Sequence, residues 1–171
     1  MMKTLIIFVF LSLNSFGGVV LDIPSALDLH FPNHEVKKKT IFLTDKSKDA
    51  LELASKSKFK KKIYTIYEAK LKGKPNKFAI METHILRSRT QTIFVVFNNK
   101  GMILSTEVLA FYEPDEYVMS KKWFNQFKGK GKKEKLLPGY DIIKVSGATI
   151  SYNETSAAIR RMIALYNYVY N

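Results

Sequence analysis

The sequence predicts an α+β fold, in which helices pack on a mostly antiparallel sheet. Two observations indicate this class. Stretches in which apolar and polar residues alternate follow one another through short turns, as in hairpins, rather than through helices. A helical pattern then closes the chain, with Ala158, Ile159, Met162 and Tyr166 on one face.

Five segments have the composition of strands, because β-branched and aromatic residues gather in them between turn residues. They span residues 40–44, 63–70, 77–86, 92–97 and 102–112. The clearest hairpin signal is Asn98-Asn99-Lys100-Gly101, since Asn and Gly tolerate the positive φ that such turns need. The last two strands should therefore pair as antiparallel neighbours.

Helical patterns lie before and between these segments as well as after them. They are expected at residues 25–30, from a cap at Asp45 or Ser47 to Lys56, and from Asp115 or Ser120 to about Phe127. In the second of these helices, Leu51 and Ala54 should face inward. In the third, Val118, Trp123 and Phe127 are the apolar positions.

The first 17 residues have the pattern of a secretory signal peptide. Met1-Met2-Lys3 is a short positive region, Thr4 to Leu13 is apolar but short for a membrane span, and Ser15 and Gly17 are small residues suited to cleavage after Gly17. We therefore expect an exported protein, periplasmic or on the outer face of the cytoplasmic membrane. Its single domain would span residues 18–171. The alternative is an N-terminal anchor that is not cleaved.

The amino-acid composition excludes several kinds of metal and cofactor site and indicates the charge of the partners. The 171 residues include no cysteine, which excludes disulfides, thiolate metal sites, iron–sulfur clusters and thioether-linked haem. His30, His34 and His84 do not form a metal-binding pattern. The net charge of +13 favours anionic partners, namely a membrane surface, an acidic redox protein or a phosphate-bearing ligand. Nucleic acid is a poor candidate for an exported protein.

Small and hydroxylated residues stand directly before the last helix, in Ser146-Gly147-Ala148-Thr149. Such a turn lets the backbone approach an anion, which the N–H groups and dipole of a helix N-terminus favour. A plain turn is the alternative. Ser151 and Glu154 have the spacing of a capping box, in which each side chain would bond to the backbone N–H of the other.

The string SGATIS, followed by an Ala- and Ile-rich helix, resembles the signature of the FMN-binding domain. That family includes the flavin-carrying subunits of the sodium-pumping quinone reductase and of the Rnf complex. In its covalent members a flavin transferase joins the FMN phosphate to the motif's Thr hydroxyl. The resemblance implies Thr149 as the acceptor, with Ser146, Gly147, Ala148 and Ser151 as further cofactor-binding residues.

The resemblance covers roughly Lys77 to Tyr166. The stretch FNNKGMILSTEVLAFYEP is similar to the family's strand, turn and returning strand, which ends in an acidic residue near the flavin. Glu113 would be that residue. Tyr112, Tyr117 and Trp123 are candidates to stack on the flavin ring, although a place in the core is the alternative for each.

Two positions depart from the family pattern. Ile143 stands where transferase-recognised members commonly have an acidic residue, and residues 87–91 replace a Gly-rich turn. The leading hypothesis is an FMN-carrying electron-transfer protein, modified by a flavin transferase, that serves a redox partner protein or a membrane electron-transfer complex. It would be a carrier rather than a complete enzyme. The alternatives are a basic binding module that has lost the flavin, which Ile143 favours, and a flavin-dependent reductase of a small substrate.

Overall fold

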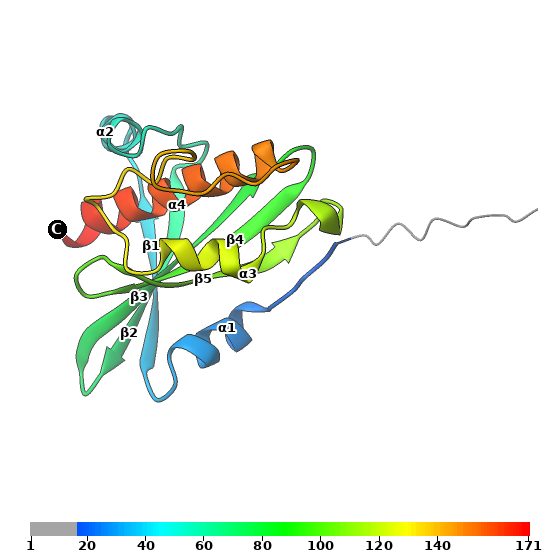
Figure 1. The fold of residues 1–171 in the computed structure, drawn as a ribbon. Coiled ribbons are helices and arrows are strands. Elements are labelled where there is room, and N and C mark those ends of the chain that lie inside the picture. Colours follow the sequence, from blue (N-terminus) through cyan, green and yellow to red (C-terminus); the bar gives the residue numbers. More distant parts are fainter. Residues whose placement is uncertain (1–16) are drawn as a thin grey trace, which may run out of the picture.

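The computed structural model describes residues 17–171, so residues 1–16 of the predicted signal peptide lie outside the described part. Five strands form one sheet in the order β1-β2-β3-β4-β5, and each strand pairs antiparallel with the next (Figure 1). The strands are β1 Glu35–Phe42, β2 Ile63–Leu71, β3 Lys74–Ile85, β4 Thr90–Asn98 and β5 Ile103–Phe111. The predicted α+β class is confirmed.

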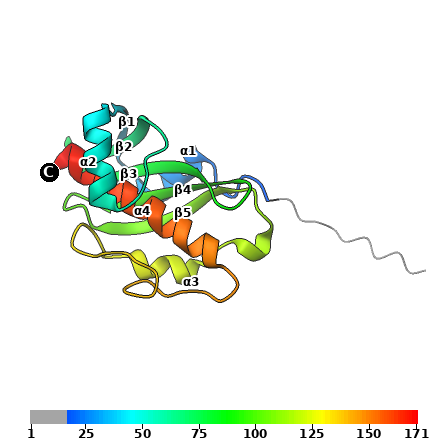
Figure 2. The same ribbon diagram turned by 90° about the horizontal axis from the view of Figure 1, so that it is seen from above.

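The helices cover both faces of this sheet. They are α1 Ile23–His30, α2 Asp45–Ser55, α3 Lys121–Phe124 and α4 Thr149–Tyr170, with short 3-10 turns η1 Asp115–Tyr117 and η2 Asn125–Phe127. The long helix α4 crosses one face, and α2 and α3 lie on the same side, while α1 lies against the other face (Figures 1 and 2). None of the helices among residues 17–171 is both long enough and apolar enough to cross a membrane.

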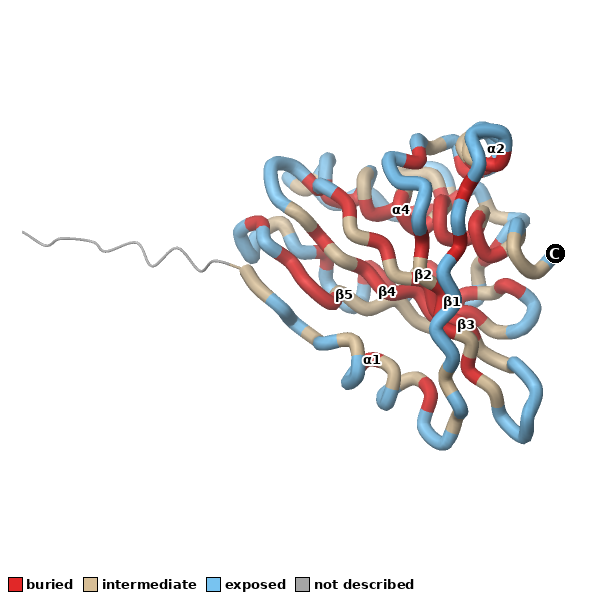
Figure 3. The backbone as a smooth tube through the Cα atoms, turned by 180° about the vertical axis from the view of Figure 1, so that it is seen from behind, coloured by how far each residue is buried: buried red, intermediate tan, exposed pale blue. Residues whose placement is uncertain are grey.

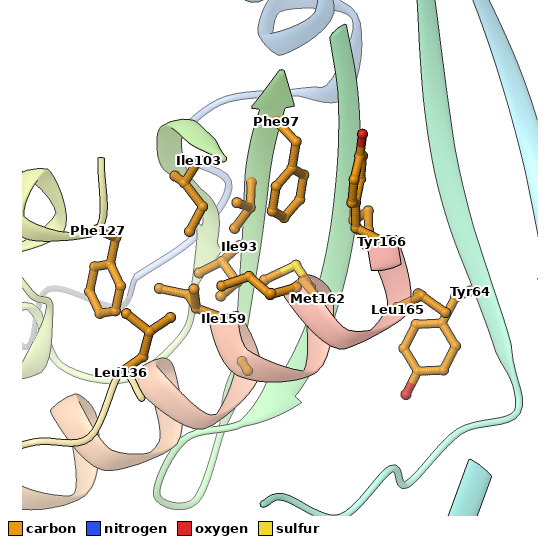
Figure 4. Close-up of a cluster of buried hydrophobic side chains, with 14 of the residues drawn as sticks. Tyr64, Ile93, Phe97, Ile103, Phe127, Leu136, Ile159, Met162, Leu165 and Tyr166 are labelled. Atoms are coloured by element: carbon orange, nitrogen blue, oxygen red, sulfur yellow. The ribbon is translucent and has the colours of Figure 1, made fainter. Parts of the chain in front are cut away.

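Alternate residues of the central strands enter two separate cores, which explains why β4 is almost entirely buried (Figure 3). On the α4 face, Ile93, Val95 and Phe97 pack with Ile159 and Tyr166 in the larger core (Figure 4). On the α1 face, the intervening β4 residues pack in a smaller core that includes alanines from β2 and β3 and one from α1. Both faces of the sheet are therefore apolar.

The predicted hairpin between β4 and β5 is confirmed. The Asn98 side chain accepts hydrogen bonds from the N–H groups of Lys100 and Met102, at 2.9 and 3.0 Å. Gly101 has φ +72°, and a Cβ at this position would lie 2.8 Å from the Tyr166 ring. The turn therefore needs glycine for two reasons, its backbone conformation and the close approach of α4.

Several local predictions were wrong. β1 begins at Glu35, so the lysines at 37–39 lie inside an exposed edge strand. Ala54, which was predicted to face inward, is exposed, and the apolar Val118 is exposed as well. Of the two starts expected for the next helix, Ser120 is the correct one, because its side chain accepts a hydrogen bond from the N–H of Trp123 at the start of α3. Asp115 instead begins the separate turn η1, and α3 ends at Phe124, where η2 follows.

We expect Tyr166→Ala to lower the free energy of unfolding by about 3–5 kcal/mol. The Tyr166 ring stacks on Phe97 and contacts Phe78, and its hydroxyl donates to the Asn98 carbonyl. The substitution therefore leaves a large cavity and removes one of the two hydrogen bonds to that carbonyl, which still accepts from the Gly101 N–H. Urea denaturation of the purified protein measures the change. The control is Tyr168→Ala on the same helix, where the side chain is 53% exposed and the loss should stay within about 0.5 kcal/mol. Equal losses in the two variants would contradict the packing described above.

Candidate functional site

Helix α4 begins without a side-chain cap. Its first residue is Thr149, and its N-cap residue, Ala148, has no side-chain hydrogen bond to offer. The predicted capping box is therefore wrong. Ser151 lies two residues inside the helix, where it is 1% exposed, so its hydroxyl points into the protein instead of capping the first turn. A turn closed by a hydrogen bond from the Ala148 N–H to the Val145 carbonyl starts the helix earlier than the sequence pattern suggests.

The missing cap leaves backbone donors free. The first N–H of α4 with a partner is that of Tyr152, which donates to the Ala148 carbonyl at 3.0 Å. The N–H groups of Thr149, Ile150 and Ser151 have no acceptor within residues 17–171. Three unpaired donors and the positive end of a 22-residue helix dipole together make this end of α4 a site for an anion.

The turn in front of the helix leaves room for such an anion. Ser146, Gly147 and Thr149 are exposed. Gly147 has φ +78°, which favours glycine, and a Cβ placed on it would meet no atom within 4 Å. The buried Ser151 hydroxyl, which has no hydrogen-bond partner among the described residues, lies in the same first turn. Because this hydroxyl points into the protein, the exposed turn and the free N–H groups, and not Ser151, are the features that fit a phosphate group.

The segment leading to the turn is held by the region around α3. The indole Nε1 of Trp123 donates to the Ile143 carbonyl at 2.8 Å, and the Ile143 N–H donates to Gln126 Oε1 at 2.7 Å. Trp123 itself is buried against Phe124 and Phe127. The structure thus places Trp123, a predicted ring contact, in the core, where it positions the backbone ahead of Ser146.

Glu113, the predicted acidic residue near the flavin, is buried and binds a loop. Its Oε1 accepts hydrogen bonds from the N–H groups of Arg87, Ser88 and Arg89, at 3.1, 2.6 and 2.7 Å. Burial opposes ionisation of this carboxyl, but the three backbone donors and the Ser88 hydroxyl outweigh it, and the pKa of Glu113 is lowered. The carboxylate therefore fixes the β3–β4 loop, which stands where the family has a Gly-rich turn.

The structure brings the turn and the end of β5 to the same end of the sheet. The Thr155 hydroxyl in α4 donates to Gln91 Oε1 at 3.1 Å, and Gln91 lies opposite Phe111, the last residue of β5. The start of α4 accordingly lies beside the loops that follow β3 and β5 in both ribbon views (Figures 1 and 2). Of the two tyrosines predicted to contact the flavin ring, Tyr112 is exposed, and Tyr117 lies under the Arg87 guanidinium, 3.8 Å from its ring centroid.

A buried polar cluster beneath α4 was not found from the sequence. Arg161 on α4 pairs with Glu82 on β3, which is 79 residues earlier in the chain, and His84 lies beside them. Burial raises the pKa of Glu82, although the paired guanidinium opposes this shift. Burial, and then the charge of Arg161, lowers the pKa of His84 to about 3, so its ring is neutral at physiological pH. No short motif links residues this far apart.

Exposed apolar side chains near the turn were also missed. Ile143, Val145 and Ile150 flank the Ser146–Thr149 turn, and all three are exposed. Apolar side chains so placed give a flat aromatic group a surface to lie on. The sequence analysis singled out Ile143 only as a departure from the family pattern, and nothing in the sequence showed that Ile143, Val145 and Ile150 are exposed together.

A comparison of the sequence with models of known protein families indicates which ligand this site binds. Residues 88–164 match the sequence model of the FMN-binding domain. This part of the chain is similar to the FMN-binding domain. The match contains β4, β5 and the Ser146–Thr149 turn, which confirms the resemblance seen in the sequence and indicates FMN as the cofactor. No curated protein and no solved structure matches the chain significantly.

We expect Glu113→Gln to destabilise the protein at neutral pH by about 1–3 kcal/mol, because a neutral amide accepts the three loop N–H bonds more weakly than a carboxylate. The folded-state pKa of Glu113 is depressed, so its contribution is present above the unfolded-state pKa and is lost as the pH falls through the folded-state value. The difference between wild type and variant should therefore shrink on acidification.

Urea denaturation at about pH 7 and at about pH 3 measures this change. Glu116→Gln is the control, because Glu116 is exposed and close by. A difference between wild type and Glu113→Gln that stays constant with pH would contradict an ionised Glu113 in the folded protein.

Proposed function

We propose that this protein is an exported electron-transfer flavoprotein whose FMN is joined through its phosphate to the Thr149 hydroxyl. The observation that carries the proposal is the uncapped start of α4. There an exposed threonine hydroxyl adjoins three backbone N–H groups that lack acceptors among the described residues. A phosphoester at Thr149 Oγ would place its phosphate oxygens at these donors.

Three residues of the turn have a role in this arrangement. Gly147 gives the backbone its left-handed conformation and leaves the space in front of the helix open. The Ser146 hydroxyl is a further donor. On attachment, Thr149 Oγ attacks the FMN phosphorus of a flavin–nucleotide donor, the P–O bond to the nucleoside monophosphate breaks, and that leaving group takes up the hydroxyl proton. The protein therefore gains the mass of one FMN less one water. FMN, when bound, supplies one- and two-electron transfer.

Export and covalent attachment support each other. An exported protein that loses a noncovalent cofactor has little opportunity to regain it, and a phosphoester prevents that loss. The modifying enzyme would be a flavin transferase acting on the exposed turn. The partner would be a redox protein or a membrane electron-transfer complex in the periplasm or at the outer face of the membrane. Many of the exposed side chains are lysines, and they favour docking on an acidic protein or an anionic membrane surface.

We expect the wild-type protein, produced with export and a flavin transferase, to carry an added mass of one FMN less one water, and Thr149→Ala to lack it. Thr149 is exposed, so its loss leaves the core intact. Intact-mass spectrometry after denaturation measures the bond, and visible absorbance measures bound flavin. Thr106→Ala, on β5, is the control and should be modified like the wild type.

Three outcomes of this experiment test separately the site of attachment, the covalent bond and the binding of FMN. A modified Thr149→Ala protein would contradict the site of attachment. A yellow protein that releases its flavin on denaturation would contradict the bond but leave FMN binding intact. A colourless, unmodified wild type would support the basic binding module that has lost the flavin.

We expect Ile143→Asp to raise the fraction of protein that is modified. The Ile143 side chain is 71% exposed and its backbone is fixed by Trp123 and Gln126, so an aspartate here meets solvent and lies in a defined place ahead of the turn. The control is Tyr140→Asp, which adds the same charge at an equally exposed position. Intact-mass spectrometry at limiting transferase compares the two, and an equal gain in both variants would show that only net charge matters.

A further inference from the structure

A second hollow lies at the other half of α4, away from the FMN site. It has a volume of about 600 Å³, within the range of small-molecule sites, and is enclosed by α2, the loop at 131–136 and the second half of α4. The nearest α4 residue in its lining is Arg160, eleven residues after Thr149, so the hollow begins about 16 Å along the helix from the phosphate site. The two sites are therefore separate.

The side chain of Arg160, on α4, is hydrogen-bonded to the other two walls of the hollow, α2 and the loop at 131–136. Arg160 Nε donates to the Ser55 carbonyl at the end of α2, and its Nη1 donates to the Leu136 carbonyl in the loop, both at 2.9 Å. Burial, and then the neighbouring charge of Arg161, lowers the pKa of Arg160. Its guanidinium is thus held at the wall of the hollow. A bound anion there would stabilise the positive charge, which burial disfavours.

The floor of the hollow is apolar and its rim is cationic. Leu51 and Ala54 on α2, together with Ile163 and Ala164 on α4, line the hollow. Around them stand Arg160 and four lysines, at positions 56, 132, 133 and 135. The lining contains one acid, Glu134, whose Oε2 accepts a hydrogen bond from the Gly131 N–H at 2.7 Å. An apolar floor beneath a rim with this excess of positive charge matches a molecule that is apolar along its length and anionic at one end.

We propose that this hollow binds a free single-chain amphiphilic anion, namely a long-chain carboxylate. The alkyl chain lies over Leu51, Ala54 and Ile163, and the carboxylate lies among Arg160 and the rim lysines. Neither half of such a ligand is sufficient alone. A short carboxylate lacks the apolar contact, and an uncharged amphiphile leaves the rim without a counter-charge.

The first experiment titrates dodecanoate into the purified protein by isothermal titration calorimetry at low salt, below the micelle concentration. We expect saturable binding with one ligand per chain. Acetate and the neutral amphiphile dodecyl maltoside should bind at least about tenfold more weakly, because each lacks one half of the interaction. Equal binding of dodecyl maltoside would overturn the proposal.

Two pairs of variants locate the site. Ala54→Trp fills the floor from an exposed position and should weaken dodecanoate binding about tenfold or more, whereas Leu53→Trp, the adjacent residue of α2 and outside the lining, should bind like the wild type. The double variant Lys132→Glu, Lys133→Glu should weaken binding similarly. The matched double variant Lys72→Glu, Lys74→Glu, in the β2–β3 turn, changes net charge equally and should not.

The charge variants decide the question if Ala54→Trp fails to fold by circular dichroism. Undiminished binding in Lys132→Glu, Lys133→Glu would refute the site. Binding to vesicles of anionic phospholipid without any binding of monomeric dodecanoate would also refute it, because that result indicates a membrane surface contact instead. Thr149→Ala should bind dodecanoate normally, which separates this inference from the proposed flavin attachment.

Discussion

A buried ion pair fixes α4 on the sheet, and both sites on that helix depend on it. Arg161 donates from Nε to Glu82 Oε1 at 3.0 Å and from Nη1 to the Ser57 hydroxyl at 2.6 Å, and both charged side chains are almost fully buried. Such a pair need not add net stability, but sliding α4 by one residue would leave both charges unpaired away from water. The register of α4 against β3 is therefore specified, and with it the positions of Thr149 and Arg160.

The bare start of α4 is tolerable because the rest of the helix is well packed. An isolated helix without a cap would fray at its first turn, but α4 has 22 residues and buries a continuous stripe against the sheet. The Thr155–Gln91 hydrogen bond attaches the helix near its beginning. Packing, instead of a cap, thus keeps the first turn of α4 helical. The N–H donors that a cap would occupy remain available to a phosphate.

The sequence predicted the features that depend on neighbouring residues and missed those that depend on distant ones. The hairpin at Asn98–Gly101 and the Ser146–Thr149 turn were found because four consecutive residues in each determine the backbone conformation, including a glycine at the position with positive φ. The capping box at Ser151 failed although its pattern is present, because burial of Ser151 inside the helix overrides the local preference. The partner of Arg161, far away on β3, is joined to it only by the fold. The cationic hollow likewise gathers residues from three segments of the chain.

The role of Glu113 connects the departure in the β3–β4 loop with the geometry of the site. Residues 87–91 contain no glycine, and the backbone N–H groups of Arg87, Ser88 and Arg89 need an acceptor. The Glu113 carboxylate supplies that acceptor from the end of β5. Arg87 is then held where its guanidinium covers Tyr117. The wall of the site beside the start of α4 is thus built from charged and aromatic side chains in fixed positions, so the loop keeps its shape without the glycines.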